Sequence, residues 1–260
     1  MQTIRLVKSI IALRIKWEMA FRINALLGFL AQIIYLFGSI LTLSVLFANV
    51  ESIGGWTHAQ FLALVATLEL LQQINSRVFR QGLRNLPALV QRGYLDTYLL
   101  RPCWTPMLIT LKGVDIAGLW RCSLGIGILV YSMQIGSMPT IVQFLSYLLS
   151  FFFSLIILVF LNACLVCLSF WVIEVNNLYF VIDDLSEFAR YPDSVYHGVI
   201  RKILTTILPL VLLSSFPARI LMNELYVNLL VHQAIVLIFF GSLAWVLWQK
   251  GLQHYQGASS

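Results

Sequence analysis

The sequence predicts an all-α protein built into a membrane, and three observations support this fold class. Of the 260 residues, 60% are hydrophobic and 11% are charged, whereas about 25% of the residues in a soluble domain are charged. The mean hydropathy of +0.86 agrees with these fractions. Several apolar runs also approach or exceed the roughly 20 residues that a helix needs to cross a bilayer. We therefore expect a polytopic membrane protein with six transmembrane helices.

The basic residues are distributed unevenly along these apolar runs. Short loops rich in Lys and Arg stay in the cytoplasm. Of the 17 Lys and Arg residues, 15 fall on one expected side, and only Arg121 and Arg219 do not. This asymmetry predicts a bacterial inner (plasma) membrane protein with both termini in the cytoplasm. The net charge is +6. The basic residues that produce it lie at the ends of the expected spans, where they meet anionic headgroups, so we expect no nucleic-acid partner.

The crossings follow one another in chain order, separated by turns or connections. Two outer turns, 51–56 and 136–139, contain no Lys or Arg. Arg201 and Lys202 mark the expected cytoplasmic start of the fifth crossing. Pro209 and Pro217 interrupt regular backbone hydrogen bonding, so residues 214–226 are expected to form short re-entrant helices on the outer side. The six expected crossings are 25–50, 57–76, 112–133, 141–172, 199–213 and 227–247.

Two further segments are expected to lie in the membrane interface. Residues 1–24 contain an amphipathic helix with basic residues on its polar faces, lying in the membrane plane. That helix is either a topology anchor or an element that touches a cytoplasmic partner. Residues 173–198 include Asp183, Asp184 and Glu187, which make this segment too acidic to cross.

The cytoplasmic connection 77–106 has a shaped central part. Pro87 suits the first turn of a short helix, and Gly93 suits the position after its C-terminus. The run that follows is Arg92-Gly93-Tyr94-Leu95-Asp96-Thr97-Tyr98-Leu99-Leu100-Arg101-Pro102. Its bulky apolar residues would gain little by facing water, so we expect a partner or the membrane surface to cover them.

This run resembles the cytoplasmic signature of the type-2 ATP-binding-cassette (ABC) permease family, Gly-x-Leu-Asp-x-x-Leu-Leu-(Arg/Lys)-Pro. Every signature position is matched between Gly93 and Pro102. The pairs Tyr191-Pro192 and Pro217-Ala218, with Pro209 between them, look like the second half of that family. The resemblance therefore covers essentially the whole chain.

The resemblance implies a permease subunit of an ABC transporter, most often an exporter, with a coupling helix docked on an ATPase. The chain lacks the phosphate-binding sequence Gly-x-x-x-x-Gly-Lys-(Ser/Thr), so we expect it to be no enzyme, with ATP and Mg²⁺ bound by a separate ABC ATPase subunit. A second permease subunit, identical or related, should complete the translocation path. The residues expected to couple to the ATPase are Leu86, Arg92, Gly93, Leu95, Asp96, Leu99, Leu100, Arg101 and Pro102.

Two ionisable residues fall inside the expected spans, Glu69 and Arg121. At about 1.5 Å per residue, each lies roughly 12 to 14 Å from the basic interface, so equal depth predicts a contact between them. The alternative is that each finds water, backbone or the neighbouring subunit. Asp115 is closer to the interface and is expected to need no special partner.

The opposing functional class is a membrane-embedded enzyme that modifies lipids. Its weak candidate site is the acidic group around Asp183. We expect no catalytic residue and no metal site, because the histidines show no helical pairing. Cys164 and Cys167 are expected to be packing residues.

Overall fold

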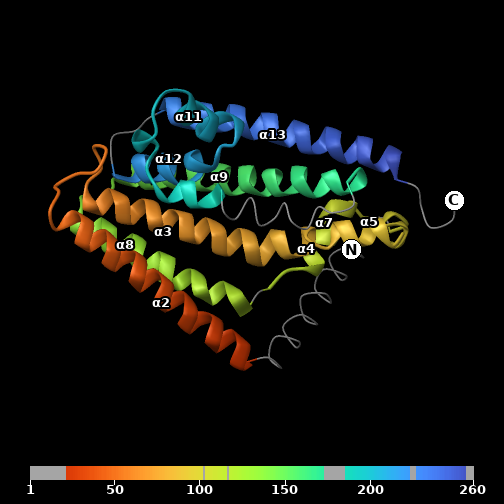
Figure 1. Cartoon of the computed structure of the whole chain (residues 1–260), viewed down its shortest axis with the longest axis horizontal. Helices are drawn as coiled ribbons and strands as arrows, with labels where there is room; N and C mark the ends of the chain where they lie inside the picture. The colour runs from red at the N-terminus through yellow and green to blue at the C-terminus, as the bar shows by residue number, and fades with distance from the viewer. Residues whose placement is uncertain (1–21, 102, 116, 173–184, 223–226, 256–260) are drawn as a thin grey trace.

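The computed structural model describes residues 22–255, apart from residues 102, 116, 173–184 and 223–226. All the regular elements in this part of the chain are helices, arranged as an elongated bundle (Figure 1). The predicted all-α class is confirmed. The interfacial helix predicted for residues 1–24 lies almost entirely outside the described residues.

The first half of the bundle is built from α2 and α3 and the helices that follow them. Three elements run on from one another, namely α3, a π-helical segment η1 and α4, so residues 58–83 form one helical stretch. The bounds are α2 Arg22–Phe47, α3 His58–Ile74, η1 Asn75–Arg80, α4 Gln81–Leu83, α5 Leu86–Gln91, α6 Asp96–Leu99, α7 Thr105–Lys112, η2 Ala117–Arg121 and α8 Cys122–Ile135.

The second half contains the two longest helices and a set of short ones between them. Thr140 and Gln143 form a capping box that starts α9, because their side chains satisfy free backbone N–H groups of the first turn. The bounds are α9 Ile141–Cys167, η3 Leu168–Phe170, η4 Glu187–Arg190, η5 Asp193–Val195, α11 Gly198–Lys202, η6 Ile203–Ile207, α12 Leu210–Met222 and α13 Val227–His254.

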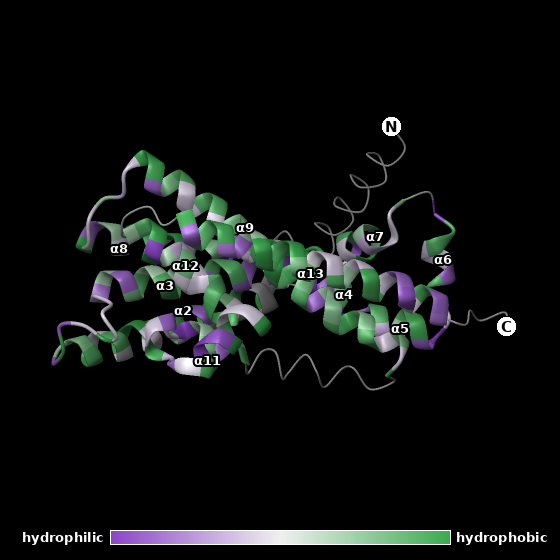
Figure 2. Cartoon of the chain, turned by 90° about the horizontal axis from the view of Figure 1, so that it is seen from above, coloured by the Kyte–Doolittle hydropathy of each residue, from purple (hydrophilic) through white to green (hydrophobic). Residues whose placement is uncertain are grey.

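Three stretches of the described chain are long and apolar enough to cross a membrane: Leu26–Phe47, Ile141–Phe170 and Val227–His254. A fourth arises if α11–η6 and α12, which meet at an angle of 89°, are counted as one. Figure 2 shows that α9 and α13 are largely hydrophobic, whereas hydrophilic residues gather around α11 and near α5 and α6. The chain is thus a membrane protein, and the count of six crossings stays a prediction.

The bundle has two distinct ends. At one end, which we call the Trp56 end, the Arg219 guanidinium lies 5.5 Å from the centroid of the Trp56 ring, and Gly136 lies against Ala59 and Met222. At the other, the α5–α6 end, Phe170 contacts Trp248 and Tyr255 at ring-centroid distances of 5.8 and 6.4 Å. Figure 1 shows these two ends at opposite sides of the view.

The fifth predicted crossing, residues 199–213, is wrong. The helix breaks between η6 and α12, where Pro209 lacks a backbone N–H, and the two parts meet at 89°. Arg201 and Arg219, predicted on opposite sides of the membrane, both bind the Asp193 carboxylate. The α11–α12 pair therefore folds back on itself at the Trp56 end, and α12 runs through the predicted boundary at residue 214.

The interfacial placement of residues 173–198 stays a prediction, although the ends of this segment can be located in the bundle. Trp171 stacks on His254 at the α5–α6 end, with the ring centroids 6.1 Å apart. Ser194 and Val195 lie against Gly54 at the Trp56 end. Trp171 and Ser194 therefore lie toward opposite ends of the bundle. Residues 173–184, with Asp183 and Asp184, lie outside the described residues.

Candidate functional site

The connection between α4 and α8 leaves the bundle through a narrow base. A Cβ atom added to Gly113 would lie 2.0 Å from the Gly82 nitrogen, so α4 and the end of α7 approach as closely as two backbones allow. Beside this crossing, the Asp115 N–H donates to the Arg77 carbonyl oxygen at 2.8 Å. Arg77 Nη1 and Asp115 Oδ2 form an ion pair at 2.5 Å. Asp115 therefore has an ion-pair partner, and the expectation that it needs none is wrong.

Within this connection, two short helices meet at Gly93. The first, α5, has Pro87 in its first turn and Arg92 as its C-cap. Gly93 follows with φ +69, a left-handed conformation that side chains disfavour. The predicted helix start and end are confirmed. The second helix, α6, then begins at Asp96, so one predicted coupling helix is in fact a pair.

The signature residues divide between two faces of this pair. Leu86 and Leu95 are 2% and 0% exposed, and they belong to a hydrophobic cluster that we call the platform cluster. Tyr94 and Leu100 are 58% and 86% exposed, beside the exposed Arg92 and Arg101. The platform cluster consists of Leu83, Leu86, Leu95, Ile109, Val166, Cys167, Phe170 and Trp248.

The platform cluster joins the exposed face to the long helices. Its members come from α4, α5, α7, the end of α9, η3 and α13 as well as from the signature itself. Leu95, the N-cap of α6, thus packs in one cluster with the ends of α9 and α13. Asp96 is half-buried, Leu99 is exposed, and Pro102 lies outside the described residues.

A polar cavity of about 370 Å³ lies between α2, α3, α9 and η4. Glu69 is 5% exposed, and its Oε1 accepts hydrogen bonds from Gln32 Nε2 at 2.5 Å and from Gln73 Nε2 at 2.7 Å. The sequence reasoning missed these two amides, because it considered only Arg121, water, backbone or the neighbouring subunit as partners. The residues that line the cavity include Gln32, Glu69, Gln73, Asn75, Asn162 and Arg190.

The second residue of the predicted polar pair approaches the same helix one turn away. The Arg121 guanidinium lies against Gly28, where an added Cβ would be 2.2 Å from Arg121 Nη2. Gly28 precedes Gln32, the partner of Glu69, by four residues, so both positions fall on one face of α2. The direct contact between Glu69 and Arg121 stays a prediction.

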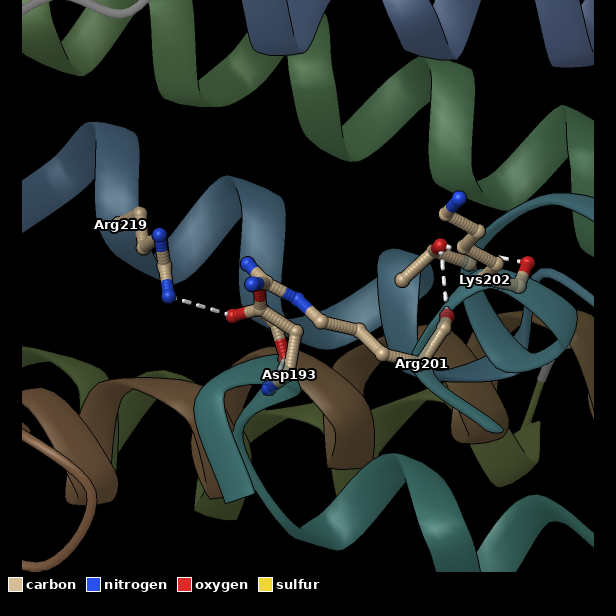
Figure 3. A network of polar contacts seen from close by, with 6 residues as sticks. Asp193, Arg201, Lys202 and Arg219 are labelled. Atoms are coloured by element: carbon tan, nitrogen blue, oxygen red, sulfur yellow. Dashed lines mark hydrogen bonds and ion pairs between the residues drawn. The ribbon is translucent and has the colours of Figure 1, made fainter. Parts of the chain in front are cut away.

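A buried carboxylate that the sequence reasoning missed lies at the Trp56 end. Asp193 is 2% exposed, and its two oxygens face two arginines (Figure 3). The distances are 2.5 Å to Arg201 Nη2 and 2.7 Å to Arg219 Nη2. The Asp193 N–H donates to Ser215 Oγ at 3.2 Å. This cluster ties η5, α11 and α12 together and explains why they stay folded back.

The features considered for an enzyme contribute no catalytic arrangement within the described residues. Glu187, the described member of the acidic group, pairs with Arg190 at 2.5 Å. Cys164 and Cys167 are buried and unoxidised, in keeping with a packing role. No group of three His, Cys, Asp or Glu residues that could hold a metal ion occurs among the residues the structure describes.

Comparison with known proteins agrees with this arrangement. No curated protein and no solved structure gives a match. A protein family described as ABC-2 family transporter protein matches residues 33–259, which include the signature segment and the fold-back around Asp193. The chain therefore belongs to the ABC-2 family of transporter proteins, whose members are membrane permease components.

Proposed function

We propose that this chain is the membrane-spanning subunit of an ABC exporter, which forms a translocation path with a second permease subunit and is driven by separate ATPase subunits. The observation that supports the proposal best is the division of the signature residues. Leu95 and Leu86 anchor the α5–α6 pair from below, while Tyr94 and Leu100 present apolar surface outward. A surface of this kind is typical of a protein interface.

In this mechanism the ATPase supplies force and the chain transmits it. ATP binding draws two ATPase subunits together, and each carries the α6 face docked on it. The platform cluster passes this movement to α9 and α13, and the two bundles rock between inward-open and outward-open states. The narrow base at Gly82 and Gly113 limits independent motion of the segment relative to the spans.

The proposed topology has six crossings with both chain ends in the cytoplasm of a bacterial inner membrane. Five of them use α2, the stretch 58–83, η2–α8, α9–η3 and α13. The sixth crossing is not assigned to a described element. Arg22 and Tyr255 then lie on the side of α5 and α6, which carries Arg80, Arg84, Arg92 and Arg101, as short basic cytoplasmic loops require.

The proposal is tested by purifying the tagged chain from detergent-solubilised membranes and identifying what accompanies it. We expect an ATPase whose peptides contain the phosphate-binding motif. Asp96→Ala and Arg101→Ala should reduce ATPase retention and uncouple ATP hydrolysis from transport. Lys250→Ala, an exposed basic residue at the same end, is the matched control. Full retention and full transport by both signature variants would overturn the proposal.

A further inference from the structure

The polar cavity beside Glu69 contains more hydrogen-bond acceptors than the described residues satisfy. Within the described part of the chain, three buried amide oxygens of lining residues have no hydrogen-bond partner: Gln73 Oε1, Asn75 Oδ1 and Asn162 Oδ1. These residues are 9%, 4% and 1% exposed. An unpaired buried acceptor lowers the stability of the folded state by about 1–3 kcal/mol. Three such acceptors around one cavity are therefore unusual unless a ligand or water binds them.

Two of these amides have their orientation fixed by a hydrogen bond from the amide nitrogen. Asn162 Nδ2 donates to the Leu158 carbonyl oxygen at 2.7 Å, and Gln73 Nε2 donates to the Glu69 carboxylate. Neither acceptor could pair with an amide oxygen. A flipped amide would therefore break a hydrogen bond in each case, and the oxygens must face away from these partners.

Glu69 adds a carboxylate to these three oxygens. Both amide donors that reach it bind the same atom, Oε1, so its second oxygen is left for the cavity. A carboxylate inside a membrane bundle is costly unless it meets a partner or a wet cavity. The other carboxylate that lines the cavity, Glu187, is paired with Arg190, whose guanidinium also lies over the Tyr35 ring at 4.7 Å.

We infer that this cavity is a binding site for a small organic cation with several N–H donors, such as a primary amine or diamine. One ammonium group would bind Glu69 and two of the oxygens of Gln73, Asn75 and Asn162, and the second ammonium group of a diamine could bind the third. A volume of about 370 Å³ falls in the range of sites for small molecules. If the proposed function is right, this ligand class is that of the transported molecule.

Binding is tested on the purified chain without any ATPase, so that the result does not depend on the transport assignment. The probes share a four-carbon skeleton: 1,4-diaminobutane, the neutral 1,4-butanediol and the anionic succinate. We expect saturable calorimetric binding of the diamine, weaker binding of the diol and none of succinate. Equal binding of all three, or no saturable binding of the diamine, would overturn the inference.

Variants assign any binding to the cavity. Glu69→Gln keeps the shape and an acceptor but removes the charge, and it should weaken diamine binding about tenfold or more. Asn162→Leu should weaken binding about two- to tenfold, whereas Asn228→Leu, an exposed amide on α13, should not. The thermal midpoint of each variant is also measured without ligand, so that a loss of folding is recognised. If Glu69→Gln or Asn162→Leu does not fold, Gln73→Leu is used in its place.

The two proposals fail separately. If an ATPase co-purifies with the chain but diamine binding by Glu69→Gln equals that of the unmodified protein, the ligand assignment is wrong and the permease assignment stands. If the diamine binds through Glu69 but no ATPase is recovered, the reverse holds.

Discussion

Asp115 and Arg77 are joined twice, once through the backbone and once through their side chains. The Asp115 N–H donates to the Arg77 carbonyl oxygen at 2.8 Å, and the carboxylate pairs with the Arg77 guanidinium at 2.5 Å. The second Asp115 oxygen accepts from the Gly118 N–H at 2.7 Å, which starts η2. One residue thus closes the base of the signature segment and begins η2.

Substitutions at Asp115 should separate these two roles. Asp115→Asn keeps an oxygen for the Gly118 N–H but loses the charge, so we expect a loss of up to about 1 kcal/mol, as for a partly exposed ion pair. Asp115→Ala loses the cap as well and should cost about 1 kcal/mol more. Thermal midpoints of the purified variants measure both. Equal midpoints for the two variants would contradict the capping role.

The crossing of Gly82 and Gly113 should tolerate no added side chain. Gly113→Ala places a methyl group 2.0 Å from the Gly82 nitrogen. Because the atoms that it meets belong to the backbone, no side chain can move aside and the helices must separate. We expect a loss of about 1–3 kcal/mol or more, together with weaker ATPase retention. Gly127→Ala in α8 is the control, since its Cβ would meet nothing within 4 Å and alanine favours a helix. A Gly113→Ala protein as stable as this control would disprove the close crossing.

The features of the signature segment that follow from local rules could be predicted from the sequence. Pro87 and Gly93 determine where α5 starts and ends through their own backbone preferences, with no help from distant residues. The division of the signature into a buried and an exposed face could not be predicted in the same way. Leu95 and Leu100 are equally apolar, and Leu95 is covered within a cluster that includes Phe170 and Trp248, which lie far along the chain.

The polar contacts inside the bundle show the limit of reasoning from charge and depth. Equal depth along two expected spans predicts that Glu69 meets Arg121, and this contact stays a prediction, because depth says nothing about which helix faces which. The amides of Gln32 and Gln73 reach Glu69 first. The same depth argument applied to Arg77 and Asp115, which stand at the interface ends of two adjacent spans, would have found their ion pair.

The partners of Asp193 were hidden by the angle at Pro209. A proline predicts an interruption of the helix. The sequence around it does not determine whether the chain continues across the membrane or turns by 89°. Once the chain turns, Arg201 and Arg219 come to one carboxylate although 18 residues separate them.

Neutralising Asp193 should therefore loosen the fold-back at the Trp56 end. Asp193→Asn keeps the shape but leaves two guanidinium groups facing an uncharged amide. Removing one partner of a fully buried pair costs about 3–5 kcal/mol, and we expect less here because the Arg201 side chain is 48% exposed. Arg201→Gln should cost about 1 kcal/mol or less, since Arg219 still compensates Asp193. Thermal midpoints should fall more for Asp193→Asn than for Arg201→Gln, and the opposite order would contradict the central role of the carboxylate.

Tyr255, just beyond α13, links the end of the chain to the signature. Its ring packs on Phe170, and its buried hydroxyl lies near the Asp96 carboxylate. Burial and then the negative charge of Asp96 raise the pKa of Tyr255 above its ordinary value of 10.0. Because the folded state favours the protonated phenol, the stabilisation is complete below about pH 10 and is lost as the pH rises through the raised pKa.

The pH dependence of stability tests this contact against a matched variant. Tyr255→Phe keeps the ring on Phe170 and removes the titrating group. We expect the thermal midpoint of the unmodified protein to fall more steeply above about pH 10 than that of the variant, because only the former would place a phenolate beside Asp96. Below about pH 10, the difference between the thermal midpoints of the two proteins should not change with pH. Parallel curves across the alkaline range would mean that the Tyr255 hydroxyl does not sense Asp96, and that the end of α13 contacts the signature segment through its apolar surface alone.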